Sequence, residues 1–125
     1  MLSSDNSQMD NARRRVALVV QQPFVLNDLP KFEVEAMLAD GTAVDVFDLS
    51  PVMFPERWAQ STRPSYPAGI TYHAMMSDAD LNTLHRHLDA AQLTICGTTT
   101  GHLSPGNLTV MREVSKARTP YMIIY

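Results

Sequence analysis

The sequence has one cysteine, Cys96, among its 125 residues. A single cysteine excludes an internal disulfide framework and fits a reducing compartment, so we expect a cytoplasmic location. No apolar run approaches the ~20 residues needed to cross a bilayer, and residues 1–15 lack the apolar centre of a signal peptide. The composition therefore predicts a protein with no transmembrane segment.

Basic charge is also scarce. Lys and Arg number 10 against 13 Asp and Glu, which gives a formal net charge of −3. A chain without a general basic field has nothing to attract nucleic acid, so we expect no nucleic-acid partner. The only basic run, residues 13–15, directly precedes the first apolar segment, and we interpret it as a solvated flank of that segment.

Glycine motifs for nucleotides are missing. The loop after the first apolar run lacks the GxGxxG turn that lets a backbone approach a pyrophosphate, and the sequence contains no P-loop. These absences disfavour NAD binding and phosphoryl transfer, and we predict no cofactor. We also predict no metal site, because His85 and His87 are two residues apart on a predicted helix and therefore point in different directions.

The residues that are present suffice for one domain. An apolar fraction of 45% over 125 residues can build a single core. Residues 1–14 are rich in Ser, Asp, Asn and Gln, and we predict that they form a disordered leader. Residues 15–125 are predicted to form a single Rossmann-like α/β domain.

Short apolar runs and helical periodicity alternate along this domain. The runs predict strands at residues 16–20, 43–49, 70–76, 93–96 and 121–125. Apolar residues at helical spacing predict helices at 29–40, at 78–91 and from Leu108 to near Arg118. Ser77 is predicted to cap the second helix and Gly41 to close the first. The proline-rich stretch 51–69 is expected to be irregular, with one helical turn near residues 56–60.

Strands that alternate with helices and lack hairpin turns imply right-handed crossovers and a parallel sheet. We therefore predict a three-layer Rossmann-like or flavodoxin-like domain with a mostly parallel five-stranded sheet. Such a domain usually continues past its fifth strand into a helix that covers the remaining apolar face. No such helix follows residues 121–125, so we expect either a domain that is incomplete at its C-terminus or a second copy that covers this face.

Ligands of open parallel sheets bind beyond the carboxyl ends of the strands. The residues there that carry suitable polar groups or allow tight turns are Gln22, Asp48, Thr98, Thr99, Thr100, Gly101, His102 and Ser104. Two structural alternatives remain open: Asp48 caps its own turn through Ser50, and Ser104 caps the helix that follows it. No catalytic residue is predicted, because Cys96 falls inside an apolar strand and no acid/base pair stands out.

Two segments carry a resemblance to a known family. The stretch RVALVVQQPFVLNDLPKFEVEAMLADGTAVDVFDLSPV resembles the amino-terminal half of GT-B-type glycosyltransferases of surface-polysaccharide biosynthesis. The stretch LTICGTTTGHLSPGNLTVMREVSKARTPYMIIY is similar to a later segment of the same domain. The match covers roughly residues 14–50 and 77–125.

The resemblance implies a role on the acceptor side of such an enzyme. In these proteins the amino-terminal domain mainly binds the acceptor, and a carboxy-terminal domain holds the nucleotide-sugar donor. We therefore expect an acceptor-side domain that is inactive alone, with a sugar acceptor and a missing donor-binding domain as its partners. The alternative is a stand-alone Rossmann-like module that binds a ligand or dimerises; a stable dimer with no ligand response would favour this alternative.

Overall fold

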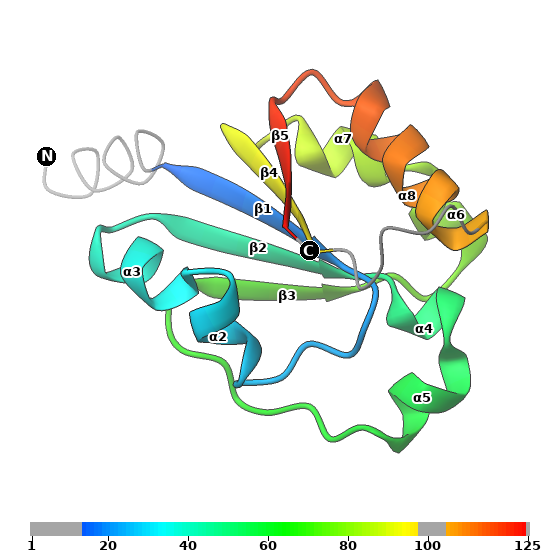
Figure 1. Ribbon diagram of the computed structural model, residues 1–125, viewed down its shortest axis with the longest axis horizontal. Helices are drawn as coiled ribbons and strands as arrows, with labels where there is room; N and C mark the ends of the chain where they lie inside the picture. Colours follow the sequence, from blue (N-terminus) through cyan, green and yellow to red (C-terminus); the bar gives the residue numbers. More distant parts are fainter. Residues whose placement is uncertain (1–13, 98–104, 125) are drawn as a thin grey trace, which may run out of the picture.

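The computed structural model describes residues 14–97 and 105–124, so most of the predicted leader lies outside the described residues. Five parallel strands form one sheet in the order β3-β2-β1-β4-β5 (Figure 1). Their bounds are β1 Arg15–Val20, β2 Ala43–Asp48, β3 Ile70–Ala74, β4 Leu93–Gly97 and β5 Tyr121–Ile124. The predicted parallel Rossmann-like α/β fold is confirmed, and the strand order is that of a Rossmann sheet.

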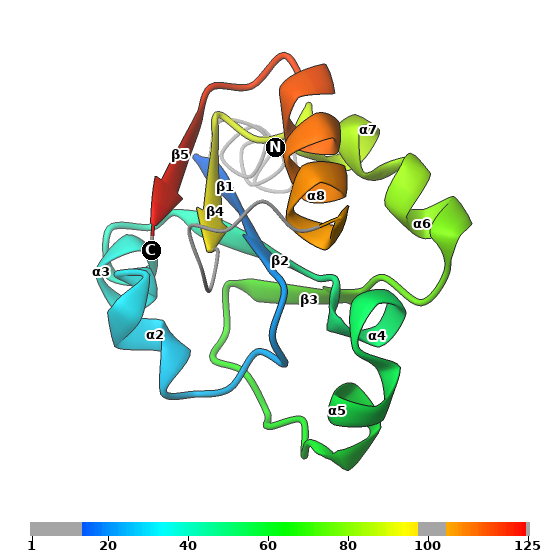
Figure 2. The same cartoon turned by 45° about the vertical axis from the view of Figure 1, so that its right-hand side comes forward.

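Helices cover both faces of the sheet (Figures 1 and 2). One face packs against α2 and α3, and the other against α4, α6, α7 and α8. The described helices are α2 Asp28–Lys31, α3 Val34–Ala39, α4 Ser50–Met53, α5 Pro55–Gln60, α6 Asp78–Asn82, α7 Leu84–Leu88 and α8 Pro105–Lys116. Alternate residues of β1 enter the two cores: Ala17 and Val19 face α6–α8, whereas Leu18 and Val20 face α2 and α3.

The prediction of one continuous helix over residues 29–40 is wrong, because the helix breaks between α2 and α3. Glu33 adopts the left-handed conformation there, with φ +56°. The resulting turn buries Leu29 and Phe32 before the break and Val34 after it, so all three side chains reach the same core. Burial of these three side chains offsets the cost of a left-handed glutamate, which is of order 1–3 kcal/mol.

The predicted helix over 78–91 is also divided, at Thr83. The Thr83 hydroxyl donates to the carbonyl oxygens of Ala79 and Asp80, at 3.3 and 3.1 Å. Back-bonding of this kind bends or interrupts helices. The predicted cap is confirmed, since the Ser77 hydroxyl accepts a hydrogen bond from the Asp80 amide at 3.2 Å.

The proline-rich stretch contains more helix than its composition predicts. The turn expected near residues 56–60 is confirmed as part of α5, but α4 was not predicted. Pro51 and Pro55 lie in the first turns of α4 and α5, where a missing amide proton costs no helical hydrogen bond. Gly41, predicted to close the first helix, has φ +83° just after α3.

The outer strand β5 keeps apolar surface at the edge of the sheet. Tyr121 and Met122 are each 45% exposed, whereas Ile123 and Ile124 pack against the two cores. Within residues 14–97 and 105–124, no helix is long and apolar enough to span a membrane.

Candidate functional site

The carboxyl ends of the strands lie at one edge of the sheet. Val20 is in register with Asp48 of β2 and with Gly97 of β4, so the carboxyl ends of β1, β2 and β4 are level. The chain leaves β1 toward β2 on one side, while β4 lies on the other side. A crevice forms where connections diverge in this way, and it is the usual ligand site of an open parallel sheet.

Asp48 joins the loop after β1, the start of α4 and strand β3 on the β2–β3 side of this edge. Its side chain is fully buried, and its Oδ1 accepts hydrogen bonds from the amide and the hydroxyl of Ser50, at 2.9 and 2.6 Å. Its Oδ2 accepts from the Phe24 amide at 3.3 Å and from the Tyr72 hydroxyl at 2.6 Å. Both oxygens are therefore satisfied by protein donors, including the Ser50 turn that the sequence offered as the structural alternative.

An aromatic group fastens the long proline-rich segment to Asp48. Trp58 Nε1 donates to the Tyr72 hydroxyl at 3.2 Å, and the Tyr66 ring lies 5.2 Å from the Tyr72 ring. Tyr66 donates to the carbonyl oxygen of Phe24 at 2.7 Å. Burial raises the pKa of Tyr72, and the hydrogen bond to Asp48 raises it further. Burial, with a smaller contribution from Asp48, raises the pKa of Tyr66 to about 12.

The β1–β4 side of the edge holds a small crevice. Its volume is about 30 Å³, which accommodates one polar group of about the size of a water molecule. It is lined by Val20, Gln21, Gln22, Asp28, Lys31, Phe32 and Gly97. Gln21 is only 4% exposed, and its Nε2 has no hydrogen-bond partner among the described residues. An unpaired buried amide is rare in folded proteins, and here it lines a crevice.

Gly97 sets the shape of this crevice. A Cβ atom at position 97 would lie 2.6 Å from the Phe32 ring, closer than real carbon atoms approach. Glycine therefore lets the ring of Phe32 pack directly on the end of β4. The Phe32 ring is this wall of the crevice. Its position depends on the break between α2 and α3 and on the glycine at the end of β4.

Gln22 connects the crevice to a second, open pocket. Its Oε1 accepts a hydrogen bond from Arg57 at 2.5 Å, and the Arg57 guanidinium lies 5.2 Å from the centre of the Phe54 ring. The open pocket has a volume of about 450 Å³. It is lined by Phe54, Pro55, Glu56, Arg57 and Gln60.

The structure treats the predicted site residues differently. Gln22 lines the crevice, whereas Asp48 is enclosed by protein donors. Thr98, Thr99, Thr100, Gly101, His102 and Ser104 lie outside the described residues. The site prediction did not include Gln21 and Lys31, which line the crevice, or Arg57, which lines the open pocket. The sequence does carry a signal for Gln21, because this polar residue directly follows a run of five apolar residues at the point where the strand ends.

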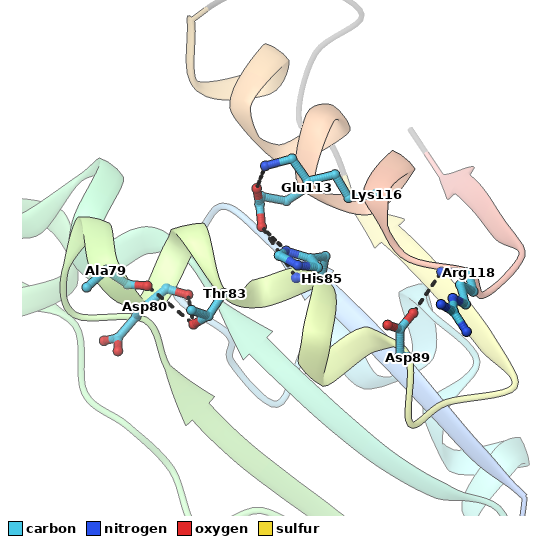
Figure 3. Close-up of polar contacts among 8 residues, drawn as sticks. All are labelled: Ala79, Asp80, Thr83, His85, Asp89, Glu113, Lys116 and Arg118. Atoms are coloured by element: carbon cyan, nitrogen blue, oxygen red, sulfur yellow. Dashed lines mark hydrogen bonds and ion pairs between the residues drawn. The ribbon is translucent and has the colours of Figure 1, made fainter.

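A second buried acid lies away from this edge, between α7 and α8. Glu113 of α8 is 1% exposed and accepts hydrogen bonds from Lys116 at 2.9 Å and from the His85 ring at 3.0 Å (Figure 3). Burial raises the pKa of Glu113, but the hydrogen bonds from Lys116 and His85 outweigh burial and hold the pKa below its usual value. This ion-paired group fixes one helix on the other and faces no described pocket.

The other candidate reactive groups are structural. Cys96 is fully buried, as predicted for a core residue, and burial raises the pKa of its thiol to about 12. His85 is engaged with Glu113, and His87 packs against the ring of Phe47, so the two rings do point to different neighbours. Among the described residues, no group of three or more His, Cys, Asp or Glu side chains is placed to hold a metal ion.

Comparisons of the chain with protein-family models, with curated proteins and with solved structures found no match.

Proposed function

We propose that this chain binds a small, sugar-bearing ligand at the mouth of the β1–β4 crevice, with one polar group of the ligand inside it, as the acceptor-side domain of a glycosyltransferase-like protein. The observation that carries the proposal is the buried Nε2 of Gln21, which has no partner among the described residues and lies at the point where the strand connections diverge. A ligand oxygen in the crevice would satisfy this amide, since a sugar hydroxyl accepts as well as donates hydrogen bonds. The sugar-transferase class itself rests on the resemblance over residues 14–50 and 77–125.

The proposal assigns binding to this chain and leaves group transfer to a donor-binding domain. The crevice offers amides, one ammonium group and one carboxylate. Groups of these kinds orient a polar ligand through hydrogen bonds.

The proposal is tested by replacing the unpaired amide. Gln21→Met keeps the length of the side chain and removes its polar atoms. We expect this variant to be more stable to urea by about 1 kcal/mol, because an unsatisfied buried group has been removed. We also expect it to lose binding of glucose, the first of a panel of hexoses, as followed by NMR chemical shifts of the ¹⁵N-labelled chain.

Thr94→Val is the matched control. Thr94 is 1% exposed and carries the other buried side-chain atom that has no partner among the described residues. This residue pairs with Tyr121 near the amino end of β4, away from the crevice. The control should gain similar stability and bind hexoses as the wild type does. If no hexose shifts the Gln21 amide signals, or if Gln21→Met binds normally, the proposal is wrong.

A dimerising module is the second candidate, and the surface of β5 favours it. Tyr121 and Met122 expose 45% of their surface on an edge strand, where a second copy could bury them. Light scattering separates the two proposals. A stable dimer that shows no hexose response favours the module, and a monomer that binds a hexose favours the acceptor-side domain.

A further inference from the structure

We propose that the ligand of the crevice carries an anionic group, a phosphate ester or a carboxylate, and that Arg57 binds this group. The inference rests on the proposed function and narrows its ligand class. It follows from a count of the hydrogen-bonding groups that the described residues leave free around the crevice. The count favours donors strongly over acceptors.

Gln21 and Gln22 both present donors. The Nε2 of Gln21 is buried and has no partner in the part of the chain that the structure describes. The Oε1 of Gln22 accepts from Arg57, whereas its Nε2 has no hydrogen bond among the described residues and is the donor that Gln22 offers to a ligand. Two adjacent side chains at the end of β1 therefore offer amide protons to a ligand. Neither Nε2 atom donates to an acceptor among the described residues.

Two cations lie beside these amides. Lys31 lines the crevice, with its Nζ 5.2 Å from the centre of the Phe32 ring that forms one wall. Arg57 is held from two sides, by Gln22 Oε1 and by the ring of Phe54. A guanidinium held in this way still has donors left for an anion, and less side-chain entropy is lost when it binds.

Two acids stand near these donors and limit the acceptors. Asp28 lines the crevice, but its Oδ2 accepts from the Val25 amide at 3.0 Å, which leaves one oxygen for a ligand hydroxyl. Glu56 lines the open pocket beside Arg57. One carboxylate oxygen in the crevice suits a hydroxyl of the ligand, whereas the surrounding donors suit oxygens that only accept, such as those of a phosphate or carboxylate.

The experiment compares three hexoses that share one ring and differ in charge: glucose, glucose 1-phosphate and glucuronate. Each is titrated into the ¹⁵N-labelled full chain, and the side-chain amide signals of Gln21 and Gln22 are followed. We expect glucose 1-phosphate or glucuronate to bind about tenfold more tightly than glucose, as for one added charge-assisted hydrogen bond. The tighter of the two identifies the anion, and its affinity should fall as salt is added.

Arg57→Gln tests the residue, and Arg63→Gln is its control in the same segment. Arg63 lies 4.0 Å from the centre of the Trp58 ring and donates to the Trp58 carbonyl oxygen, so it loses the same charge without touching the crevice. We expect Arg57→Gln to remove the roughly tenfold preference for the charged hexose. Arg63→Gln should retain the preference.

The outcomes separate the two proposals. If glucose and its charged analogues bind equally, the anion inference is wrong while the proposed function stands. If Arg57→Gln and Arg63→Gln weaken the charged ligand equally, the assignment to Arg57 is wrong. If none of the three shifts the glutamine amides, the crevice holds only water, and the proposed function fails together with the inference.

Discussion

The two halves of one sheet edge satisfy their polar groups in opposite ways. At the end of β2, Asp48 receives four hydrogen bonds from protein donors and is fully buried. At the end of β1, Gln21 is also buried, and its Nε2 donates to no acceptor among the described residues. A satisfied polar network rigidifies a fold, and an unsatisfied donor marks a place where a bound group can add free energy. The hydrogen bonds of Asp48 hold one half of the edge together, whereas the Nε2 of Gln21 is the reason that we propose ligand binding at the other half.

The difference originates in the long segment between β2 and β3. Its residues fold back over the β2–β3 half, where Trp58 and Tyr66 reach the same aromatic group as Tyr72. On the β1–β4 half, the glycine at position 97 lets the Phe32 ring form one wall of the crevice, and no described residue supplies an acceptor for the Nε2 of Gln21. The carboxyl ends of β1 and β2 are level in the sheet, yet the polar groups near them have different hydrogen-bond partners.

Removing the carboxylate of Asp48 should produce the largest effect. Asp48→Ala leaves the amides of Phe24 and Ser50 and two hydroxyl groups without their acceptor, and we expect a loss of about 4 kcal/mol in the free energy of unfolding. Urea denaturation measures it. Asp40→Ala is the control, since that exposed carboxylate only approaches Arg14 at 3.9 Å and should change stability by less than about 0.5 kcal/mol. Equal effects of the two variants would remove the basis of the comparison.

Glu113 tests whether a set of donors that includes the charged Lys116 ammonium group holds a buried acid as firmly as the neutral donors of Asp48. Glu113→Gln should cost about 3 kcal/mol at pH 7, because Lys116 and His85 lose a charged acceptor. The pKa of Glu113 is lowered in the folded protein, so its contribution is complete above the ordinary value of 4.5 and is lost as the pH falls through the folded value.

Urea denaturation of both proteins between pH 7 and pH 3 measures this change. The gap between wild type and Glu113→Gln should narrow below pH 4.5. Glu35→Gln, a charge change on the exposed surface of α3, should differ from the wild type by a nearly constant, small amount over the same range. A gap that stays the same at all pH values would mean that Glu113 contributes through packing alone.

Most of the fold could be predicted from the sequence because it depends on local patterns. β-branched runs such as residues 16–20 placed all five strands, and alternation with helices gave a parallel sheet. The two helix breaks could not be predicted, because Glu33 and Thr83 are ordinary helical residues by composition. Their breaks follow from burial of Val34 in one case and from a hydroxyl that bonds back to the helix in the other.

The site was less predictable, because its properties depend on partners that are distant in the sequence. Asp48 has the position of a ligand-binding acid, yet Tyr72 and Phe24, each 24 residues away, enclose it. Gln22 was chosen for its position after β1, but its link to Arg57 spans 35 residues. The absence of a partner for Gln21 is a tertiary property, and no spacing in the sequence reports it.

Gly97→Ala tests the wall of the crevice. The added methyl group would overlap the Phe32 ring, and we expect destabilisation of about 2 kcal/mol from overpacking. Phe32→Leu provides room, so the double variant should lose less stability than the sum of the two single variants, as a double-mutant cycle in urea would report. Additive losses would mean that the ring does not rest on Gly97.

The smallest effect is expected for Tyr72→Phe, which removes one of the four donors of Asp48. We expect a loss of about 1 kcal/mol at pH 7, because three donors remain and the partly exposed Trp58 regains water. The pKa of Tyr72 is raised in the folded protein, so the unfolded chain ionises first, near pH 10, and wild-type stability falls as the pH rises further. Urea denaturation at pH 7 and pH 10.5 should therefore show the advantage of the wild type narrowing at the higher pH. If the advantage of the wild type grows instead, the Tyr72 hydroxyl does not donate to Asp48. The hydrogen bonds of Asp48 would then not account for the stability of the β2–β3 half of the edge.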